Sequence, residues 1–569
     1  MNIDSLNDRQ KEAVLYNDGP LLIIAGAGAG KTKTLTTKIA YLIEEDLARP
    51  YNILAITFTN KAAKEMKDRL YLLIGDIAKH IQVSTFHSFG LKLLRENFTA
   101  LGYEANFVIM DSDDSLTVVK KILKDMNCDP KVYNPRAIRN KISSCKNEMM
   151  TPDVYERYAI SEYEKVVHKV YEKYEDKLHK NNSVDFDDLL LLPIKLFKEN
   201  PIILEKYQEL YKYILIDEYQ DTNEAQYILT KMISEKNRRI TCVGDDSQSI
   251  YSFRGANYKN ILNFENDYKD AKTILLEENY RSTSNILDAA NQVIRNNKMR
   301  KDKNLWTSRG VGEKIKYYRS YNERDEAQYI IRKTKEMVNR GVEYKDIAVL
   351  YRTNAQSRVI EEEMLKENMP YKVIGSINFY NRKEIKDLLA YLRLIHNSRD
   401  NVSLLRVINT PKRGIGLKTI DNLTEKADLE GTSIYDAISS GKELEFKTII
   451  EKLKAISEEL TLTELIDKVL DASGMKADLE SEKSLEAEVR LENLEEFKSI
   501  TKTFEEREGL VSLEDFLLET TLVSDVEEYK DDPNRISLMT VHSVKGLEFD
   551  HVFVVGMEEG IFPHMNSLM

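Results

Sequence analysis

Alternating alanines and glycines, followed by Lys31 and Thr32, occur early in the 569-residue chain. The run AGAGAGKT directly follows the apolar run LLIIA and opens an amphipathic helical pattern. Glycines let backbone N–H groups approach phosphates at a helix N-terminus, Lys31 would reach the β- and γ-phosphates, and Thr32 would hold Mg²⁺. Ala25 stands where the general pattern has its first glycine. The predicted phosphate cradle consists of Ala25, Gly26, Ala27, Gly28, Ala29, Gly30, Lys31 and Thr32.

Two neighbouring carboxylates, Asp217 and Glu218, end a second apolar run in the segment ILIDEYQD. Ligands of α/β folds bind at the carboxyl edge of the sheet, which is where such a pair would lie. We expect Asp217 to hold Mg²⁺ and Glu218 to polarise an attacking water as the general base. A lone pair of this kind is usually surface charge, but together with a phosphate cradle it indicates hydrolysis of a nucleoside triphosphate.

Polar and aromatic residues follow a third apolar run in the segment VGDDSQSIYSFRGA. Gln248 could sense a γ-phosphate by hydrogen bonding. Tyr251 and Phe253 offer stacking faces and Arg254 a phosphate contact, a combination that suits unpaired bases. Aromatic residues at this spacing are more often part of a core, so the segment by itself leaves both interpretations open.

Short apolar runs, each followed by a helical pattern, must position these residues. Such units predict an α/β fold with parallel sheets. Residues 113–180 and the acidic stretch up to Asp532 have helical patterns, so we expect two α/β bodies, each interrupted by a helical insertion. Strands are predicted at Leu21–Ala25, Ile53–Thr59, Tyr213–Tyr219, Ile240–Asp246, Lys314–Ser320, Ile347–Thr353, Tyr371–Gly375, Arg535–His542 and Asp550–Met557.

The distribution of charge changes what the net charge implies. With 83 Lys and Arg against 95 Asp and Glu, the net charge of −12 would argue against a nucleic-acid partner. Residues 425–532, however, hold 31 acidic and 13 basic residues, whereas residues 281–320 hold 10 basic and 3 acidic ones. The body outside the acidic module is therefore net positive and could follow a phosphate backbone, although solvated surface charge is the plainer interpretation.

Three widely spaced cysteines and an amino terminus without an apolar run indicate a reducing cytoplasm.

These segments, in their order along the chain, resemble the UvrD/PcrA/Rep-type superfamily 1 DNA helicases, in which Ala25 is the usual residue. The resemblance extends over essentially the whole chain. Its further segments are LNDRQKEAV (6–14), TFTNKAAKEM (57–66), STFHSFG (84–90), DFDDLL (185–190), LEENYRST (276–283), LYRTNAQSR (350–358), FYNRKEIKD (379–387), PKRGIG (411–416) and TVHSVKGLEF (540–549).

The resemblance implies roles for individual residues. Gln10 would read adenine, Glu548 would lie at the nucleotide sugar, and Arg281 would contact the γ-phosphate from the second motor domain. The implied catalytic set is Lys31, Asp217, Glu218, Gln248 and Arg281. Contacts with DNA are implied for Phe58, Asn60, His87, Phe186, Tyr251, Phe253, Arg254, Arg358, Lys412, Arg413, His542 and Lys545.

The resemblance also implies two RecA-like P-loop motor domains, each with a mainly helical insertion. The first motor domain would comprise residues 1–104 and 185–275, with its insertion at 105–184. The second would comprise residues 276–375 and 533–569, with the acidic insertion at 376–532, and would be incomplete at the C-terminus.

The implied activity is ATP-dependent 3′-to-5′ translocation on single-stranded DNA, coupled to duplex unwinding in repair or replication. ATP and Mg²⁺ would be the cofactors, and single-stranded DNA and its junction with duplex the partners. Repair or replication proteins are possible partners, and the chain would act in the cytoplasm as a monomer or DNA-dependent dimer.

Two departures from the family are visible. The aromatic residue after the Gln248 motif is Phe253 instead of tryptophan, so stacking should survive on a smaller face. No arginine motif of the GITRA type follows FPH before Met569. We therefore expect binding of ATP and DNA with poor hydrolysis. Alternatives are a non-catalytic ATP- and DNA-binding fragment or a helicase subunit of an AddA/RecB-type helicase–nuclease, which would need a nuclease domain.

Overall fold

The computed structural model describes residues 3–250, 256–257, 259–297, 300–301, 303–374, 382–482, 485–508, 512–524 and 534–563. The chain forms two compact units. The first comprises Met1–Lys314 and Glu384–Leu522, and the second comprises Ile315–Lys383 and Val523–Met569. The limits of the two motor domains and two insertions within these units stay a prediction.

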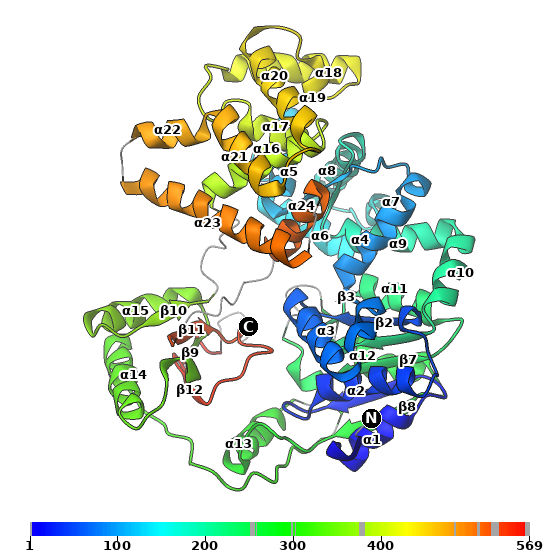
Figure 1. The fold of residues 1–569 in the computed structure, drawn as a ribbon, viewed down its shortest axis with the longest axis vertical. Coiled ribbons are helices and arrows are strands. Elements are labelled where there is room, and N and C mark those ends of the chain that lie inside the picture. Colours follow the sequence, from blue (N-terminus) through cyan, green and yellow to red (C-terminus); the bar gives the residue numbers. More distant parts are fainter. Residues whose placement is uncertain are drawn as a thin grey trace. The chain divides into compact units, whose positions relative to one another are not determined.

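A six-stranded parallel sheet organises the first unit (Figure 1). Its strands stand in the order β3-β2-β6-β7-β1-β8, so the chain crosses over between neighbouring strands through helices. The strands are β1 (Leu21–Ala25), β2 (Ile53–Thr57), β3 (Gln82–Thr85), β6 (Tyr213–Ile216), β7 (Ile240–Gly244) and β8 (Lys272–Leu276). The helices around it are α1 (Asp8–Leu15), α2 (Lys31–Glu44), α3 (Asn60–Ile74), α4 (Phe86–Asn97), α9 (Asp188–Glu199), α10 (Pro201–Leu210), α11 (Glu224–Ser234), α12 (Lys259–Asp267) and α13 (Ser284–Ile294).

Alternate residues of β1 enter two separate cores, because successive side chains of a strand point to opposite faces. Leu22 and Ile24 pack with residues of α4, α9, α11 and α12, whereas Leu21, Ile23 and Ala25 pack with residues of α1, α2 and α3. Both faces of the sheet are therefore covered, as a parallel sheet requires. The carboxyl ends of its strands meet at one edge, where β1, β6 and β7 each lead into a polar loop.

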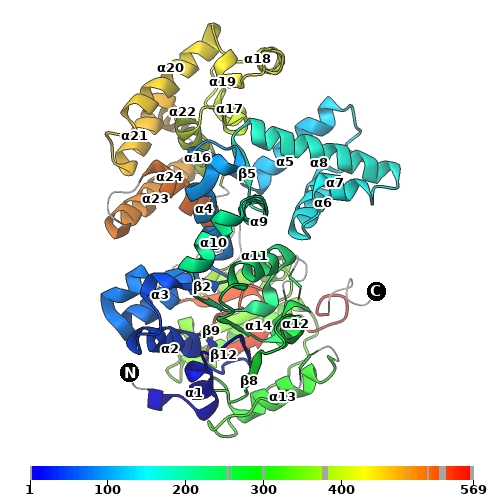
Figure 2. The ribbon, with the colours of Figure 1, turned by 90° about the vertical axis from the view of Figure 1, so that its right-hand side faces the viewer.

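A helical insertion, visible as a bundle in Figure 2, separates α4 from α9. Its apolar side chains form a core of their own, and its two short strands pair in parallel. Its elements are β4 (Val108–Met110), α5 (Ser112–Asp125), α6 (Pro135–Asn147), α7 (Pro152–Glu156), α8 (Glu162–Lys180) and β5 (Ser183–Asp185).

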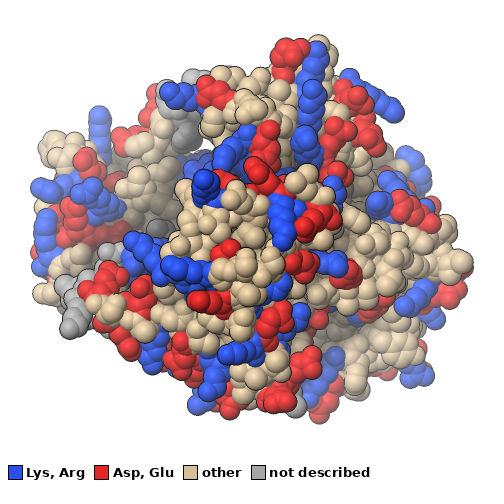
Figure 3. Space-filling view, turned by 90° about the horizontal axis from the view of Figure 1, so that it is seen from above, with Lys and Arg blue, Asp and Glu red and all other residues tan. Residues whose placement is uncertain are grey.

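The acidic stretch of the chain belongs to a second part of the first unit, whose described elements are all helices. On the face seen in Figure 3, Lys and Arg are interspersed with Asp and Glu, so the acidic excess does not make that face uniformly negative. The helices are α16 (Lys383–His396), α17 (Asn401–Val407), α18 (Leu417–Glu430), α19 (Ile434–Ala437), α20 (Gly441–Ile456), α21 (Leu462–Ser473), α22 (Met475–Glu482), α23 (Leu485–Glu508) and α24 (Leu513–Ser524).

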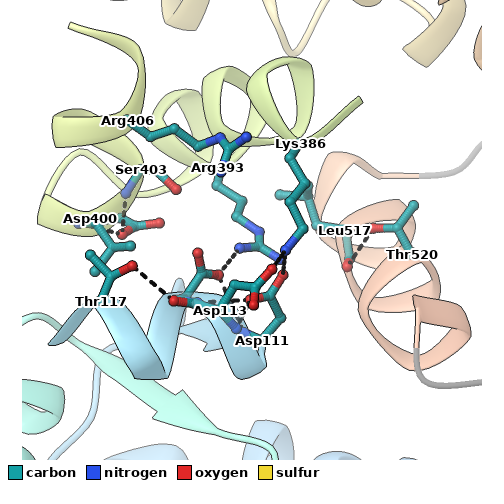
Figure 4. Close-up of polar contacts among 12 residues, drawn as sticks. Asp111, Asp113, Thr117, Lys386, Arg393, Asp400, Ser403, Arg406, Leu517 and Thr520 are labelled. Carbon is teal, nitrogen blue, oxygen red and sulfur yellow. Dashed lines mark hydrogen bonds and ion pairs between the residues drawn. The ribbon is translucent and has the colours of Figure 1, made fainter. Parts of the chain in front are cut away.

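Ion pairs join this acidic part to the N-terminal turn of α5 (Figure 4). Lys386 Nζ lies 3.2 Å from Asp111 Oδ2 and 2.5 Å from Asp113 Oδ2, and Arg393 pairs with Asp114. Burial raises the pKa of Asp114 to about 6 even though Arg393 acts in the opposite direction. These ion pairs connect α16 to the start of α5.

The second unit contains a four-stranded parallel sheet in the order β10-β11-β9-β12. Helices α14 (Glu323–Val338) and α15 (Ser357–Lys366) cover one face, and residues that follow β11 cover the other. The strands are β9 (Ile347–Tyr351), β10 (Tyr371–Val373), β11 (Ile536–Thr540) and β12 (His551–Val554).

The predicted α/β class with parallel sheets is confirmed, and the predicted strands are present with one exception. Leu21–Ala25 has the predicted bounds, and the other strands are shorter than predicted. The strand predicted at Lys314–Ser320 is wrong, because the structure assigns no strand to these residues. Ile315 is 61% and Tyr317 85% exposed. Apolar alternation favours a strand only where a neighbouring strand supplies a backbone partner. The sequence interpretation also omits β3, β4, β5 and β8.

None of the helices in the described part combines the length and the apolar composition needed to span a lipid bilayer.

Candidate nucleotide and DNA sites

The loop between β1 and α2 forms the predicted phosphate cradle. Gly28 and Gly30 have φ angles of +65° and +77°, a region that favours glycine. A Cβ atom on Gly28 would lie 2.6 Å from Asn279 Nδ2, and one on Gly30 would lie 2.8 Å from Gln10 Nε2. The glycines are therefore required both by backbone conformation and by the closeness of their neighbours, and the loop leads directly into the N-terminus of α2.

Gln10 lies against this loop from the first helix. Its Nε2 donates a hydrogen bond to the Ala29 carbonyl oxygen at 3.0 Å, and its Oε1 accepts one from the Asn7 backbone N–H at 3.1 Å. Asn7 Oδ1 in turn accepts from the Gln10 N–H, which completes a capping box at the start of α1. The structure thus brings Gln10 and the cradle together.

The carboxylates after β6 face the first residues of α2. Lys31 Nζ lies 3.1 Å from Glu218 Oε1, and the Thr32 hydroxyl donates to Asp217 Oδ2 at 3.3 Å. Burial by itself lowers the pKa of Lys31, but the carboxylates of Glu218, Asp217 and Asp245 outweigh it, so the pKa is raised. Lys31 is therefore charged at neutral pH.

Burial, followed by the charge of Glu218, raises the pKa of Asp217 to about 6. A buried carboxylate with a raised pKa lacks the counter-charge that a divalent cation supplies. Hydroxyl and carboxylate oxygens are also the ligands that Mg²⁺ prefers. Thr32 and Asp217 therefore fit the predicted Mg²⁺.

A chain of hydrogen bonds links Glu218 to Gln248. Gln220 Nε2 donates to Glu218 Oε2 at 2.5 Å, and Gln220 Oε1 accepts from the Asp245 N–H at 2.9 Å. Gln248 Nε2 then donates to Asp245 Oδ2 at 2.8 Å. Lys303, whose side chain is buried, pairs with Asp245 and with Asp246. The orientation of Gln248 is consequently coupled to the carboxylate expected to be the general base.

The segment that carries Arg281 also lies against the cradle. Asn279 Nδ2 donates to the Ala27 carbonyl oxygen at 2.6 Å, and the Tyr280 N–H donates to the Gly28 carbonyl oxygen at 3.0 Å. Asn279 Oδ1 accepts from the Arg281 N–H at 2.8 Å. Within the first unit, the backbone of Arg281 is thus held beside the phosphate cradle.

Four of the residues implied to contact DNA lie where β2, β3 and β5 end. Phe58 and Asn60 follow β2, and His87 lies in the first turn of α4, directly after β3. The rings of His87 and Phe186 are stacked with centroids 4.0 Å apart and an interplanar angle of 26°. Burial lowers the pKa of His87 to about 3, so the imidazole is neutral. His87 thus follows a strand of the six-stranded sheet at the same edge as the nucleotide residues, whereas Phe186 reaches it from the end of β5 in the two-stranded sheet.

The structure gives Arg413 partners inside the acidic part. Its guanidinium donates to the Tyr391 hydroxyl at 2.6 Å and to the carbonyl oxygens of Ser473 and Val407 at 2.7 and 3.1 Å. Lys412, by contrast, is exposed. DNA contact by the PKRGIG loop stays a prediction, in which Arg413 shapes the loop and Lys412 is the accessible charge.

Arg358, His542, Lys545 and Glu548 belong to the second unit. Arg358 is on α15, where its Nε lies 3.1 Å from Glu362 Oε1. The other three follow β11, in the segment whose apolar side chains cover the second sheet. Tyr251, Phe253 and Arg254 lie outside the described residues.

Three polar residues of the nucleotide site are absent from the sequence interpretation: Gln220, Asn279 and Lys303. Gln220 and Asn279 stand inside the quoted motifs, so their position beside named residues was a usable signal. Lys303 has no such signal, because its partners Asp245 and Asp246 are more than fifty residues away in sequence.

Comparisons with known proteins agree with this geometry. Residues 6–269 match the UvrD/REP helicase N-terminal domain, and residues 274–569 match the UvrD-like helicase C-terminal domain. The chain is 48% identical over 579 residues to the ATP-dependent DNA helicase PcrA of Staphylococcus aureus strain Mu50, covering 100% of this chain and 79% of that protein. It is also 48% identical over 585 residues to the protein of the same name from Bacillus subtilis strain 168, with the same coverage.

A parallel sheet with a phosphate cradle and two carboxylates at its edge defines a P-loop enzyme of the helicase class. The chain belongs to the UvrD/REP helicase family.

Proposed function

We propose that the chain is an ATP-dependent DNA helicase that moves 3′ to 5′ on single-stranded DNA and opens duplex ahead of it. The observation that carries the proposal is the pairing of Lys31 with Glu218 and of Thr32 with Asp217, on the same sheet edge as His87, whose ring is stacked on that of Phe186. The names of the two PcrA relatives support DNA as the substrate.

The nucleotide residues divide the work of phosphoryl transfer. Lys31 neutralises charge on the β- and γ-phosphates, and the N–H groups at the start of α2 hold their oxygens. Glu218 accepts the proton of the attacking water, and Gln248 reports the presence of the γ-phosphate through its hydrogen bond with Asp245. Arg281 stabilises the charge that develops on the transferred group.

Thr32 and Asp217 would hold Mg²⁺, which when bound neutralises phosphate charge and orients the oxygens of the nucleotide.

DNA contacts rest on stacking more than on charge. A neutral His87 beside Phe186 presents an aromatic surface on which a base can stack, and stacking on aromatic side chains accepts any base. The excess of basic residues outside the acidic part supplies attraction for the phosphate backbone. The substrate is thus single-stranded DNA and its junction with duplex, bound without strong sequence preference.

We place this activity in DNA repair or replication in the cytoplasm, with repair or replication proteins as partners and a monomer or DNA-dependent dimer as the acting form. The family resemblance supports these assignments.

ATP hydrolysis with and without oligodeoxythymidine, followed by unwinding of duplexes that carry a 3′ or a 5′ tail, tests the proposal. We expect DNA to stimulate hydrolysis and the 3′-tailed DNA duplex to be opened. An ATPase that ignores DNA would contradict the proposed function, and opening of the 5′-tailed duplex alone would contradict the direction.

A further inference from the structure

A buried lysine of the helical insertion lies at the centre of a carboxylate cluster that the proposed mechanism does not use. The side chain of Lys146, from α6, is 0% exposed. Its Nζ lies 2.8 Å from Asp185 Oδ2, 2.7 Å from Asp188 Oδ1 and 2.8 Å from Glu175 Oε1. The Tyr174 hydroxyl donates a further hydrogen bond to Asp185 Oδ2 at 3.0 Å.

Two of these carboxylates close a tight turn. The Asp188 N–H donates to Asp185 Oδ1 at 2.9 Å, and the Asp185 N–H donates to Asp188 Oδ2 at 3.0 Å. One oxygen of each carboxylate thus accepts a hydrogen bond within the turn, and the other oxygen pairs with Lys146. Phe186 stands between the two aspartates, and its ring is the one stacked on His87.

Asn147, the next residue of α6, also forms a hydrogen bond with this turn. Asn147 Nδ2 donates to Asp187 Oδ1 at 2.8 Å, and Asn147 Oδ1 accepts from Asn223 Nδ2 at 2.5 Å. Asn223 caps the N-terminus of α11, which begins shortly after Asp217 and Glu218. Lys146 and Asn147 therefore both hold the turn, and Asn147 also connects it to the cap of α11.

The charges of the cluster make Lys146 indispensable to it. Burial by itself lowers the pKa of Lys146, but Asp185, Asp188 and Glu175 outweigh it and hold the pKa well above the usual value. Burial by itself raises the pKa of Asp185, but the charge of Lys146 and its hydrogen bonds outweigh burial and lower the pKa, so this carboxylate is charged. Without the ammonium group, the turn would contain buried carboxylates with no counter-charge, and it would open to let them reach water.

We propose that Lys146 and Asn147 are positioning residues for single-stranded DNA: they hold the Asp185–Asp188 turn so that Phe186 stays stacked on His87. The inference rests on the proposed function, since it assumes that this stack meets a base. Neither residue touches DNA in this arrangement. Each acts through Phe186.

A double-mutant cycle between Lys146→Met and Phe186→Ala tests this, with affinity for labelled oligodeoxythymidine as the measurement. We expect each single variant to weaken binding by about tenfold, the loss of one stacking partner. In the Phe186→Ala background, Lys146→Met should add no further loss, because the group through which it acts is already gone. An equal loss in both backgrounds would overturn the positioning role.

The two levels of the proposal fail differently. If Phe186→Ala leaves DNA affinity unchanged, the proposed DNA contact at Phe186 is wrong. If Phe186→Ala weakens binding and Lys146→Met does not, only the positioning role is wrong. The DNA concentration that half-saturates ATPase stimulation should rise with Lys146→Met, while hydrolysis without DNA stays within about twofold, a separation that general loss of folded protein would not produce.

Lys165→Met is the matched control, because Lys165 is on α8 of the same insertion but pairs with Glu162 at the surface. It should bind DNA like the unaltered chain. If Lys146→Met does not fold, Asn147→Ala takes its place in the cycle, since it removes the contacts with Asp187 and Asn223 and leaves the buried charges paired. An unchanged DNA affinity for Asn147→Ala would then overturn the proposal.

Discussion

Lys31 and Lys146 both lie among carboxylates, but the surroundings of the two ammonium groups differ. Asp217 and Glu218 approach Lys31 from consecutive positions at one strand end, and the side chains of Lys31 and Glu218 are 12% and 24% exposed. Around Lys146 the carboxylates come from α8 and from a turn, and the lysine has no exposed surface.

The difference separates a site that can accept a ligand from one that only holds structure. An ammonium group has three donors, and Lys146 lies within hydrogen-bonding distance of three carboxylates. Lys31 instead lies at the start of a helix whose first N–H groups need acceptors. The glycines before it have no side chains that would keep a ligand away from the backbone. A buried charge is therefore informative about function only together with the exposure and remaining hydrogen-bonding capacity of its partners.

Lys31→Ala should have the largest effect on activity. We expect ATP hydrolysis to fall by ~10³-fold, because the variant lacks the preorganised ammonium group that faces the β- and γ-phosphates. The melting temperature should change little, since Glu218 is partly exposed and can be hydrated. Steady-state ATPase rates and thermal melts measure the two effects. Lys33→Ala is the matched control on the same helix, because Lys33 donates to the Ser5 carbonyl oxygen at the surface. If Lys31→Ala unfolds the chain, the conclusion that Lys31, unlike Lys146, serves a ligand and not the fold is wrong.

Glu218→Gln should reduce the maximal rate of hydrolysis by ~10²-fold and leave nucleotide affinity almost unchanged, because a general base acts on the water and not on the bound phosphates. Rates at saturating ATP and binding of a fluorescent nucleotide separate the two quantities. Weakened binding at an unchanged rate would instead assign Glu218 to holding the nucleotide.

His87 stacks on Phe186, which belongs to the turn that Lys146 holds. Its imidazole should make the stability of the chain depend on pH. In the unfolded chain it binds a proton below its usual pKa of 6.5, whereas in the folded chain burial lowers the pKa to about 3. Stability is therefore fully present above pH 6.5 and decreases as the pH falls below it. Between pH 7 and 5 the expected loss from His87 is about 2 kcal/mol in the free energy of unfolding.

Urea unfolding at both pH values measures this loss, and His87→Gln should remove that part of the slope. A slope that is identical in the variant would show that the imidazole is not buried in its neutral form.

Lys303→Met should have the smallest effect, a decrease of about tenfold in the rate of hydrolysis at saturating ATP, because Lys303 acts on Gln248 only through Asp245. Lys301→Met is the matched control, since Lys301 Nζ pairs with Glu265 at 2.7 Å on the surface. In a Gln248→Ala background the Lys303 effect should disappear. A full additional loss there would assign Lys303 to stability alone.

Much of the fold and of the nucleotide site could be predicted because their signals are local. Each predicted strand that exists is a short run of apolar residues, and the cradle is a continuous run from Ala25 to Thr32. The strand predicted at Lys314–Ser320 alternates basic and apolar residues, but the described part of the chain gives it no sheet partner. A local pattern reports the preference of a segment and not the presence of its neighbour.

The sequence by itself determined the α/β class, the phosphate cradle and the carboxylate pair, since these depend on residue types at short spacing. It also indicated the helicase family through the resemblance of its ordered motifs. Only the tertiary structure decided which distant side chains meet. Asn279 reaches Ala27 across 252 positions, Lys303 reaches Asp245 across 58, and Lys146 closes the turn that carries Phe186 from 39 positions away. Such pairings depend on how whole elements pack, because each partner obtains its role from burial and from the charges that folding brings beside it.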